Sequence, residues 1–199
     1  MAKQRLAADA DELVLDCAAR LFRERGFEAT TVRDISRAAG MLPGSLHYRY
    51  PTKGVLLLAL MRRGLTLDLA AVDAAIAPEA DPVERLRLAL RAHIRFILSR
   101  DSTAVVLFEW RSIEPEAHAE MVRLRDQYDA YWARLLAEAN RAGRLAGGLD
   151  LKMLRFMLFG AANWVSMWYR ASGDRTPDDI ADAFWDFLAR GILARPAQS

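Results

Sequence analysis

The segment from residue 30 to residue 53 constrains this chain most, because it reads as two short helices joined by a tight turn. Thr31 followed by Asp34 is a helix-start pattern, since the hydroxyl accepts a backbone N–H and the acid favours the positive helix end. Gly40 predicts the turn, because a residue without a Cβ tolerates the left-handed conformation. Pro43 suits the first turn of the second helix. Such a pair is too small to fold alone, so we predict a helix-turn-helix packed on another helix.

The same segment resembles the DNA-binding signature of the TetR family of one-component bacterial regulators. The matches fall at fixed spacing on Thr31, Ile35, Ala39, Gly40, Gly44, Leu46, Tyr48, Tyr50 and Lys53. Three residues depart from the family pattern: Leu42 replaces a common capping serine, Pro43 a polar reader of bases or phosphates, and His47 a tyrosine. The resemblance implies an all-α, TetR-like fold. It divides the chain into a three-helix DNA-binding head over residues 1–53, with the helix-turn-helix at about 31–50, and a six-helix ligand-binding and dimerisation body over residues 54–199.

Residues at the helix starts around this turn are the expected DNA contacts. A recognition helix enters the major groove with its first residues toward the base edges, and helix starts suit phosphates because their N–H groups are free. We therefore expect contacts with a double-stranded DNA operator from Thr31, Arg33, Leu42, Pro43, Gly44, Ser45, His47, Tyr48, Thr52 and Lys53. The resemblance implies that Lys53 clamps a phosphate, whereas Leu46 and Tyr50 are expected in the core. The alternative is that these residues are ordinary solvated helix ends.

The charge balance bears on how DNA is bound. The net charge is +2, and residues 1–53 carry nine Lys and Arg against seven Asp and Glu. General attraction to a polyanion is therefore weak, so affinity has to come from the placement of individual contacts. Two heads about 34–36 Å apart on one face of DNA read a palindrome together, which makes a homodimer a functional requirement.

Apolar residues at helical spacing predict about nine helices along the chain. They are expected to begin near Asp9, Thr31, Pro43, Thr52, Asp81, Ser102, Pro115, Asp150 and Thr176. Residues 151–170 differ from the rest, because between Phe156 and Tyr169 only Asn163 and Ser166 are polar. A helix of this kind needs cover on two sides, so we predict that the last two helices form a four-helix dimer interface. Its expected members are Phe159, Trp168, Phe184, Phe187 and Leu188.

Aromatic residues and methionines in the predicted body suit a mostly apolar effector pocket. The candidates are Phe108, Trp110, Arg111, Tyr128, Trp132, Met153, Phe156, Met157, Asn163, Trp164 and Met167. Arg111 and His93 are candidates to meet a carboxylate or thioester tail. The alternative for each residue taken alone is a place in the core.

Leu42 together with residues 164–170 is similar to a branch of the family that includes repressors of steroid-ring and acyl-CoA catabolism. This similarity implies a small apolar effector, such as an acyl-CoA or a fatty acyl compound. We expect a repressor that leaves a palindromic operator when the effector shifts the body to a state whose heads no longer fit the DNA. The residues themselves do not distinguish a repressor from an activator.

Other functions find little support in the sequence. His47, His93 and His118 have no zinc-ligand spacing, and G-x-S-x-G and glycine-rich phosphate motifs are absent, so we predict no enzyme, metal or cofactor. The lone cysteine, Cys17, allows no disulfide within the chain and fits a reducing cytoplasm. No uncharged apolar run of about 18 residues predicts a membrane span. The alternative function is a helical small-molecule-binding protein or an enzyme without DNA binding.

Overall fold

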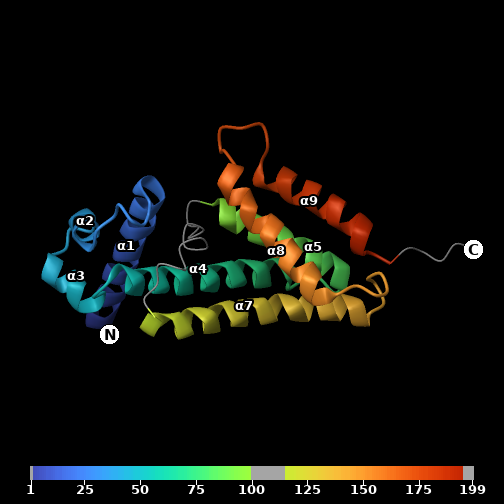
Figure 1. The fold of residues 1–199 in the computed structure, drawn as a ribbon, viewed down its shortest axis with the longest axis horizontal. Coiled ribbons are helices and arrows are strands. Elements are labelled where there is room, and N and C mark those ends of the chain that lie inside the picture. The colour runs from blue at the N-terminus through green and yellow to red at the C-terminus, as the bar shows by residue number, and fades with distance from the viewer. Residues whose placement is uncertain (1, 100–114, 195–199) are drawn as a thin grey trace, which may run out of the picture. The chain divides into compact units, whose positions relative to one another are not determined.

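The structure is a computed structural model that describes residues 2–99 and 115–194. Over these ranges it contains eight α-helices and no strand, which confirms the all-α prediction (Figure 1). The helices are α1 (Ala2–Arg25), α2 (Val32–Ala38), α3 (Pro43–Arg49), α4 (Lys53–Ile76), α5 (Pro82–Leu98), α7 (Pro115–Arg141), α8 (Leu151–Trp168) and α9 (Pro177–Ile192). The helix expected over about 102–113 lies outside the described residues, together with the pocket candidates Phe108, Trp110 and Arg111.

The start of α1 differs from the prediction. The helix begins at Ala2, so the expected start with a capping box near Asp9 was wrong. The reason is that residues 2–8 contain no glycine or proline to stop a helix from extending toward the N-terminus. At the other end, Gly26 adopts a φ of 83° and its N–H donates to the Phe22 carbonyl at 2.9 Å, as expected of a glycine that ends a helix.

The chain forms two compact units. The first contains Met1–Gly64 and the start of α7 up to Leu124, and the second contains the rest of α4, α5, the rest of α7, α8 and α9. The helices α4 and α7 therefore each pass from one unit to the other. On α4 the first unit ends at Gly64, eleven residues after the expected boundary at residue 53. We call the first the head unit and the second the body unit.

The core of the head unit comes from the apolar faces of α1, α2, α3 and the first turns of α4. Phe22 and Phe27 pack with ring centroids 5.0 Å apart, and Ile35 of α2 and Leu46 of α3 are fully buried. Arg63 of α4 forms ion pairs with two acids of α1, so charge as well as apolar packing holds α4 to the head unit. Each short helix is thus anchored by one or two buried side chains, as a helix-turn-helix requires.

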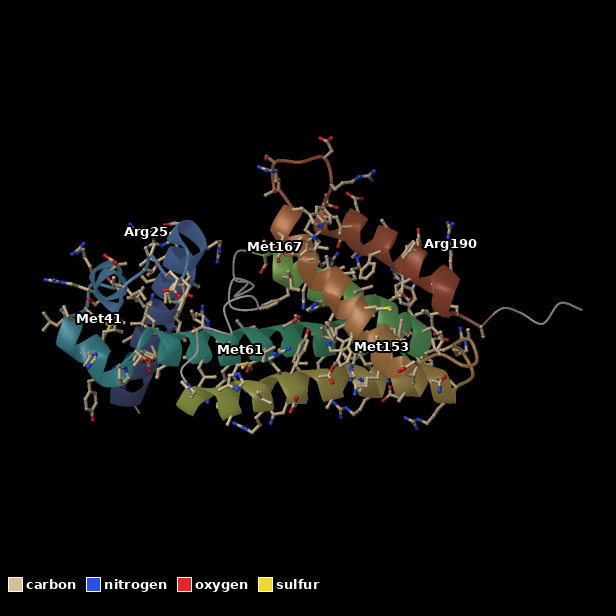
Figure 2. The ribbon with its side chains drawn as sticks, in the orientation of Figure 1. Arg25, Met41, Met61, Met153, Met167 and Arg190 are labelled. Atoms are coloured by element: carbon tan, nitrogen blue, oxygen red, sulfur yellow. The ribbon has the colours of Figure 1, made fainter. Side chains whose placement is uncertain are left out.

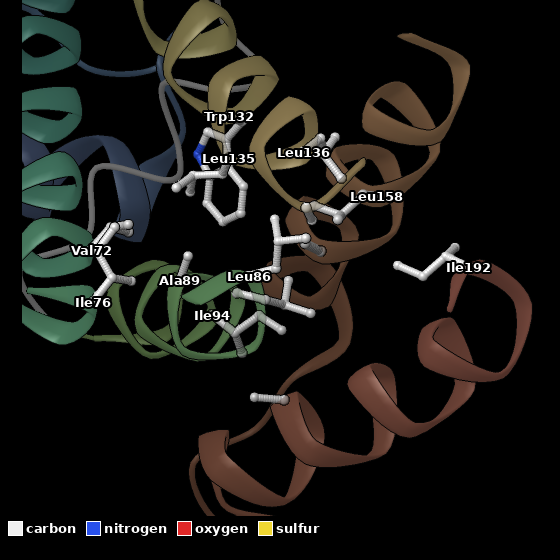
Figure 3. Close-up of a cluster of buried hydrophobic side chains, with 14 of the residues drawn as sticks. Val72, Ile76, Leu86, Ala89, Ile94, Trp132, Leu135, Leu136, Leu158 and Ile192 are labelled. Carbon is white, nitrogen blue, oxygen red and sulfur yellow. The ribbon is translucent and has the colours of Figure 1, made fainter. Parts of the chain in front are cut away.

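The core of the body unit joins α5, α7, α8 and α9 with the end of α4 (Figure 3). Trp132 is its largest fully buried side chain. On α8 the buried positions are Leu158, Ala162 and Val165, which recur at the spacing of one helical face. Outside this core, Arg91 and Arg95 of α5 pair with Asp178 of α9 and tie these two helices together.

Candidate nucleic-acid interface and effector site

The start of α2 is fixed by the predicted capping box. The Thr31 hydroxyl accepts the Asp34 N–H at 3.1 Å, and the Asp34 carboxylate accepts the Thr31 N–H at 3.2 Å. These hydrogen bonds from the Thr31 hydroxyl and backbone lower the pKa of Asp34 below its ordinary value. Gly40 follows α2 with a φ of 64°, as the predicted turn requires. The Thr31 hydroxyl is therefore already engaged in the cap, while Arg33 is exposed at the helix start.

The helix α3 presents an exposed surface of mixed chemistry (Figure 2 shows the side chains of this region around the labelled Met41). Its N-cap residue Leu42 makes no side-chain capping bond and is 77% exposed, and Tyr48 is 89% exposed. The remaining expected DNA contacts on this helix are exposed as well: Pro43, Gly44, Ser45 and His47. Leu46 points the other way and is fully buried, as expected. The fold thus separates the expected groove-facing residues of α3 from the residue that anchors the helix.

Ion pairing fixes the orientation of α3 at its C-terminal end. Arg49 donates to the Asp11 carboxylate of α1 at 2.5 Å. Tyr50 follows as the C-cap and is half-buried, and burial together with the nearby charge of Asp11 raises the pKa of its phenol. The exposed face of α3 is therefore held in one direction by α1.

Lys53, the first residue of α4, is held by the loop between α1 and α2. Its ammonium donates to the carbonyls of Phe27 at 2.9 Å and Glu28 at 3.2 Å, and it lies 4.5 Å from the centre of the Phe27 ring. The Thr52 hydroxyl caps the same helix start by accepting the Val55 N–H at 3.2 Å. The Glu28 carboxylate lies 3.8 Å from the same ammonium, an ion pair beyond hydrogen-bond distance. An ammonium has three N–H donors, so the third donor of Lys53 makes no hydrogen bond to the described residues. The sequence carries no signal for the contacts with residues 27 and 28.

A buried polar cluster lies inside the body unit, with one residue from each of four helices: Asp68 of α4, His93 of α5, Tyr128 of α7 and Asn163 of α8. We call these four residues the polar quartet. The Tyr128 hydroxyl donates to Asp68 Oδ2 at 2.6 Å, and His93 Nδ1 lies 2.7 Å from the same oxygen. His93 Nε2 lies 3.2 Å from Asn163 Oδ1. Burial and the charge of Asp68 raise the pKa of the Tyr128 phenol well above its ordinary value, which keeps it a hydrogen-bond donor.

Aromatic rings surround the polar quartet. The Phe159 ring lies 5.6 Å from His93 and 5.1 Å from Trp132, both edge-on. Phe159 was expected at the dimer interface, but it lies here because it is four residues before Asn163 and shares its face of α8. Tyr128, Trp132 and Asn163, three of the expected pocket residues, thus come together with His93. The sequence analysis did not include Asp68 among the expected pocket residues. Its position as the one acidic residue between Val55 and Val72 was a signal for it.

The other expected pocket residues of α8 lie on its opposite face. They are half-exposed or more: Met153, Phe156, Met157, Trp164 and Met167. Two expected dimer residues, Trp168 of α8 and Phe187 of α9, are exposed as well, whereas Phe184 and Leu188 are partly buried against the body core. Between α8 and α9 runs a groove of about 460 Å³ with Trp168 and Phe184 among its lining residues. Large exposed apolar surfaces are uncommon on proteins and are typical of interaction sites.

Within residues 2–99 and 115–194, no group of three or more His, Cys, Asp or Glu is arranged to hold a metal ion. In the same part of the chain, none of the helices has the length and apolarity that crossing a bilayer requires.

Two family models match the chain. The model described as "Bacterial regulatory proteins, tetR family" matches residues 14–60, and the one described as "Tetracyclin repressor-like, C-terminal domain" matches residues 79–192. The chain is 28% identical over 183 residues to the HTH-type transcriptional repressor KstR2 of Mycobacterium tuberculosis, and these residues cover 90% of each chain.

Solved structures give the same result. The structure of the ketosteroid transcriptional regulator KstR2 of Mycobacterium tuberculosis superposes with a TM-score of 0.79 at 26% identity, covering 93% of this chain and 95% of that one. AibR in complex with isovaleryl coenzyme A and operator DNA superposes with a TM-score of 0.79 at 27% identity, covering 90% of this chain and 97% of that one. The similarity therefore extends over both units.

Proposed function

This chain belongs to the TetR family of bacterial regulatory proteins, and from that premise we propose that it is a ligand-responsive repressor that binds a palindromic operator as a homodimer. The observation that carries the proposal is the exposed face of α3 within the residues matched by the family's DNA-binding model. The repressor KstR2 and the DNA-bound AibR, which resemble the chain over nearly its whole length, support it. Such a protein acts where the DNA is, in the cytoplasm, and the proposal assigns it no catalytic step.

The proposed DNA contacts are those expected from the sequence. The exposed Leu42 side chain has the chemistry to meet a thymine methyl group, and Ser45, His47 and Tyr48 offer hydrogen bonds to base edges or phosphates. The remaining donor of Lys53 and the start of α4 suit a phosphate. We place the functional head at residues 1–53 and the effector-binding, dimerising body at residues 54–199.

The homodimer rests on the exposed apolar side chains of α8 and α9. Met157, Trp164 and Trp168 of α8 and Phe187 of α9 are each more than half exposed. A second copy of the chain covers such a surface through the same residues on both partners, because a two-fold interface is isologous. One head carries little excess charge, so two linked heads are needed for useful affinity.

The proposed effector is a small apolar acyl compound that binds the body unit. The ring-lined interior around the polar quartet and the AibR complex with isovaleryl coenzyme A both support this class. Asp68 links this interior to α4, the helix that begins at Lys53 in the head unit. A ligand that prefers one body state by about 1–3 kcal/mol changes operator affinity 5- to 150-fold, which is enough for regulation.

The test is DNA binding by alanine variants of two exposed leucines. Leu42→Ala removes an exposed side chain from the start of α3, and Leu13→Ala removes one from the surface of α1. With DNA upstream of the gene, a gel shift is expected to show about tenfold weaker binding for Leu42→Ala, a loss of about 1.4 kcal/mol, and unchanged binding for Leu13→Ala. No shifted band with wild-type protein, in a selection from genomic DNA as well, refutes the proposed function.

A further inference from the structure

Within the described part of the chain, only one of the two carboxylate oxygens of Asp68 takes part in hydrogen bonds. Oδ2 accepts from Tyr128 and lies beside His93 Nδ1, whereas Oδ1 is buried and has no hydrogen-bond partner among the described residues. The side chain is 6% exposed, so solvent does not serve that oxygen directly. A buried polar atom without a partner is costly, and native proteins keep few of them. Among the described residues, this oxygen is therefore an acceptor left without a donor.

Trp132 supplies a hydrogen-bond donor in the same cluster. Its indole N–H is buried and, within the described part of the chain, makes no hydrogen bond of good geometry. It lies close enough to the Tyr128 oxygen to lower the pKa of that phenol slightly, against the larger effect of burial. The Trp132 ring is 5.7 Å from His93 and 6.4 Å from Tyr128, between ring centroids. Among the described residues, an acceptor without a partner and a donor without a hydrogen bond of good geometry thus belong to one ring-lined cluster.

The chemistry of these two atoms selects the ligand. A carboxylate oxygen accepts hydrogen bonds and cannot donate them, so the group facing Oδ1 has to carry an O–H or N–H. A free fatty acid, ionised at neutral pH, supplies no donor and brings a second negative charge to the Asp68 carboxylate. An amide or hydroxyl supplies the donor, and an adjacent carbonyl accepts from Trp132. Thioesters of coenzyme A carry an amide group of this kind a short distance beyond the thioester.

We propose that Asp68 Oδ1 and the Trp132 indole N–H bind the polar group of the effector, and that they select an acyl derivative whose chain is followed by an uncharged amide or hydroxyl donor over the free acid. This inference rests on the proposed effector site in the body unit and adds the class of ligand. Because Asp68 belongs to α4, a donor bound to its Oδ1 contacts this helix directly, while Oδ2 keeps its contacts with Tyr128 and His93. Binding is thereby coupled to the helix that leads to the head.

The test is isothermal titration calorimetry with octanamide, octanoate and octanoyl-CoA. The first two have the same chain and size and differ in the donor and the charge of the head group. For wild-type protein, we expect octanamide and octanoyl-CoA to bind and octanoate to bind at least tenfold more weakly than octanamide. For Asp68→Asn, which can present an N–H in place of Oδ1, we expect octanamide to lose about tenfold and octanoate to gain.

Asp73→Asn is the matched control. Asp73 is also on α4 and also accepts from a tyrosine, Tyr131, at 2.5 Å, but it is exposed and lies outside the polar quartet. It should keep the wild-type order of affinities. Trp132→Phe keeps most of the ring and removes the N–H, so it should weaken octanamide several-fold and provides a second reading if Asp68→Asn does not fold.

Three results overturn the inference: equal affinity of octanoate and octanamide for wild-type protein, an unchanged affinity for octanamide in Asp68→Asn or in Trp132→Phe, or no binding of any of the three compounds. None of them touches the proposed DNA-binding function, which the gel shift with the same preparation measures without ligand. Conversely, head-group selection in calorimetry without a shifted DNA band leaves the ligand class standing and refutes the repressor.

Discussion

Replacing Lys53 with methionine tests whether this residue holds α4 to the head unit. The change keeps the apolar stem over the Phe27 ring and removes the ammonium that donates to the carbonyls of Phe27 and Glu28. Hydrogen bonds from a charged donor contribute about 1.5–3 kcal/mol each when buried. The Lys53 side chain is 26% exposed and Glu28 is exposed, so water replaces part of the loss. We therefore expect the free energy of unfolding to fall by about 2 kcal/mol in total.

Thermal unfolding followed by circular dichroism measures this loss. For a chain of 199 residues, each kcal/mol corresponds to about 2–4 °C, so the melting temperature should fall by about 4–8 °C. Arg20→Met is the control, because it removes a cation whose pair with Glu24 is half-exposed on α1. Exposed pairs contribute little, and the control should melt within about 1–2 °C of wild type. A Lys53→Met melting temperature equal to that of the control refutes the reasoning.

The salt dependence of DNA binding separates the two roles of Lys53. If its third N–H contacts a phosphate, Lys53→Met lowers the slope of log affinity against log salt by about 1 for each head, because one fewer counterion is released. We expect this change together with the loss of stability. A lower melting temperature with an unchanged slope assigns Lys53 to the fold of the head alone.

The other predictions concern the body unit. Hydrogen bonds from Arg95 and Arg91 hold the pKa of Asp178 well below its ordinary value. The ionised acid therefore stabilises the fold above about pH 4, and this contribution is lost as the pH falls further. The urea midpoint of Asp178→Asn should lie below that of wild type at pH 7 and approach it at about pH 2.5, and a difference that stays constant with pH contradicts this. Leu136→Ala, at a fully buried position, should cost about 2–5 kcal/mol in the same assay, and less than 1 kcal/mol means that the core is not packed there. Trp164→Glu, at an exposed position of α8, should give monomers in analytical ultracentrifugation with an unchanged circular dichroism spectrum, and a dimer that persists argues against this surface as the interface.

Local features of the chain were predictable from residues close in sequence. Thr31 and Asp34 form the expected capping box, Gly40 has the expected left-handed backbone, and Leu46 is buried on α3. These features depend on hydrogen bonds and backbone preferences over three or four residues, so composition and spacing are sufficient to predict them. The start of α1 was missed for a related reason, since no local stop signal precedes Asp9.

The candidate sites depended on contacts between distant residues. Lys53 meets Phe27 and Glu28 of another loop, and Asp68 meets Tyr128 across 60 positions, neither of which any local pattern encodes. The helix α8 shows why periodicity fails as well, because it is apolar nearly all round and a pattern without a polar side does not say which face is buried.

The amino-acid order was thus sufficient for the helix-turn-helix, the all-α class and the family, because each depends on short-range spacing. The packing of α4, α5, α7 and α8 was required to assign Phe159 to the interior and Trp164 to the surface, and to place Asp68, His93, Tyr128 and Asn163 together. Burial and pairing are properties of several helices at once, and no single helix contains the information that specifies them.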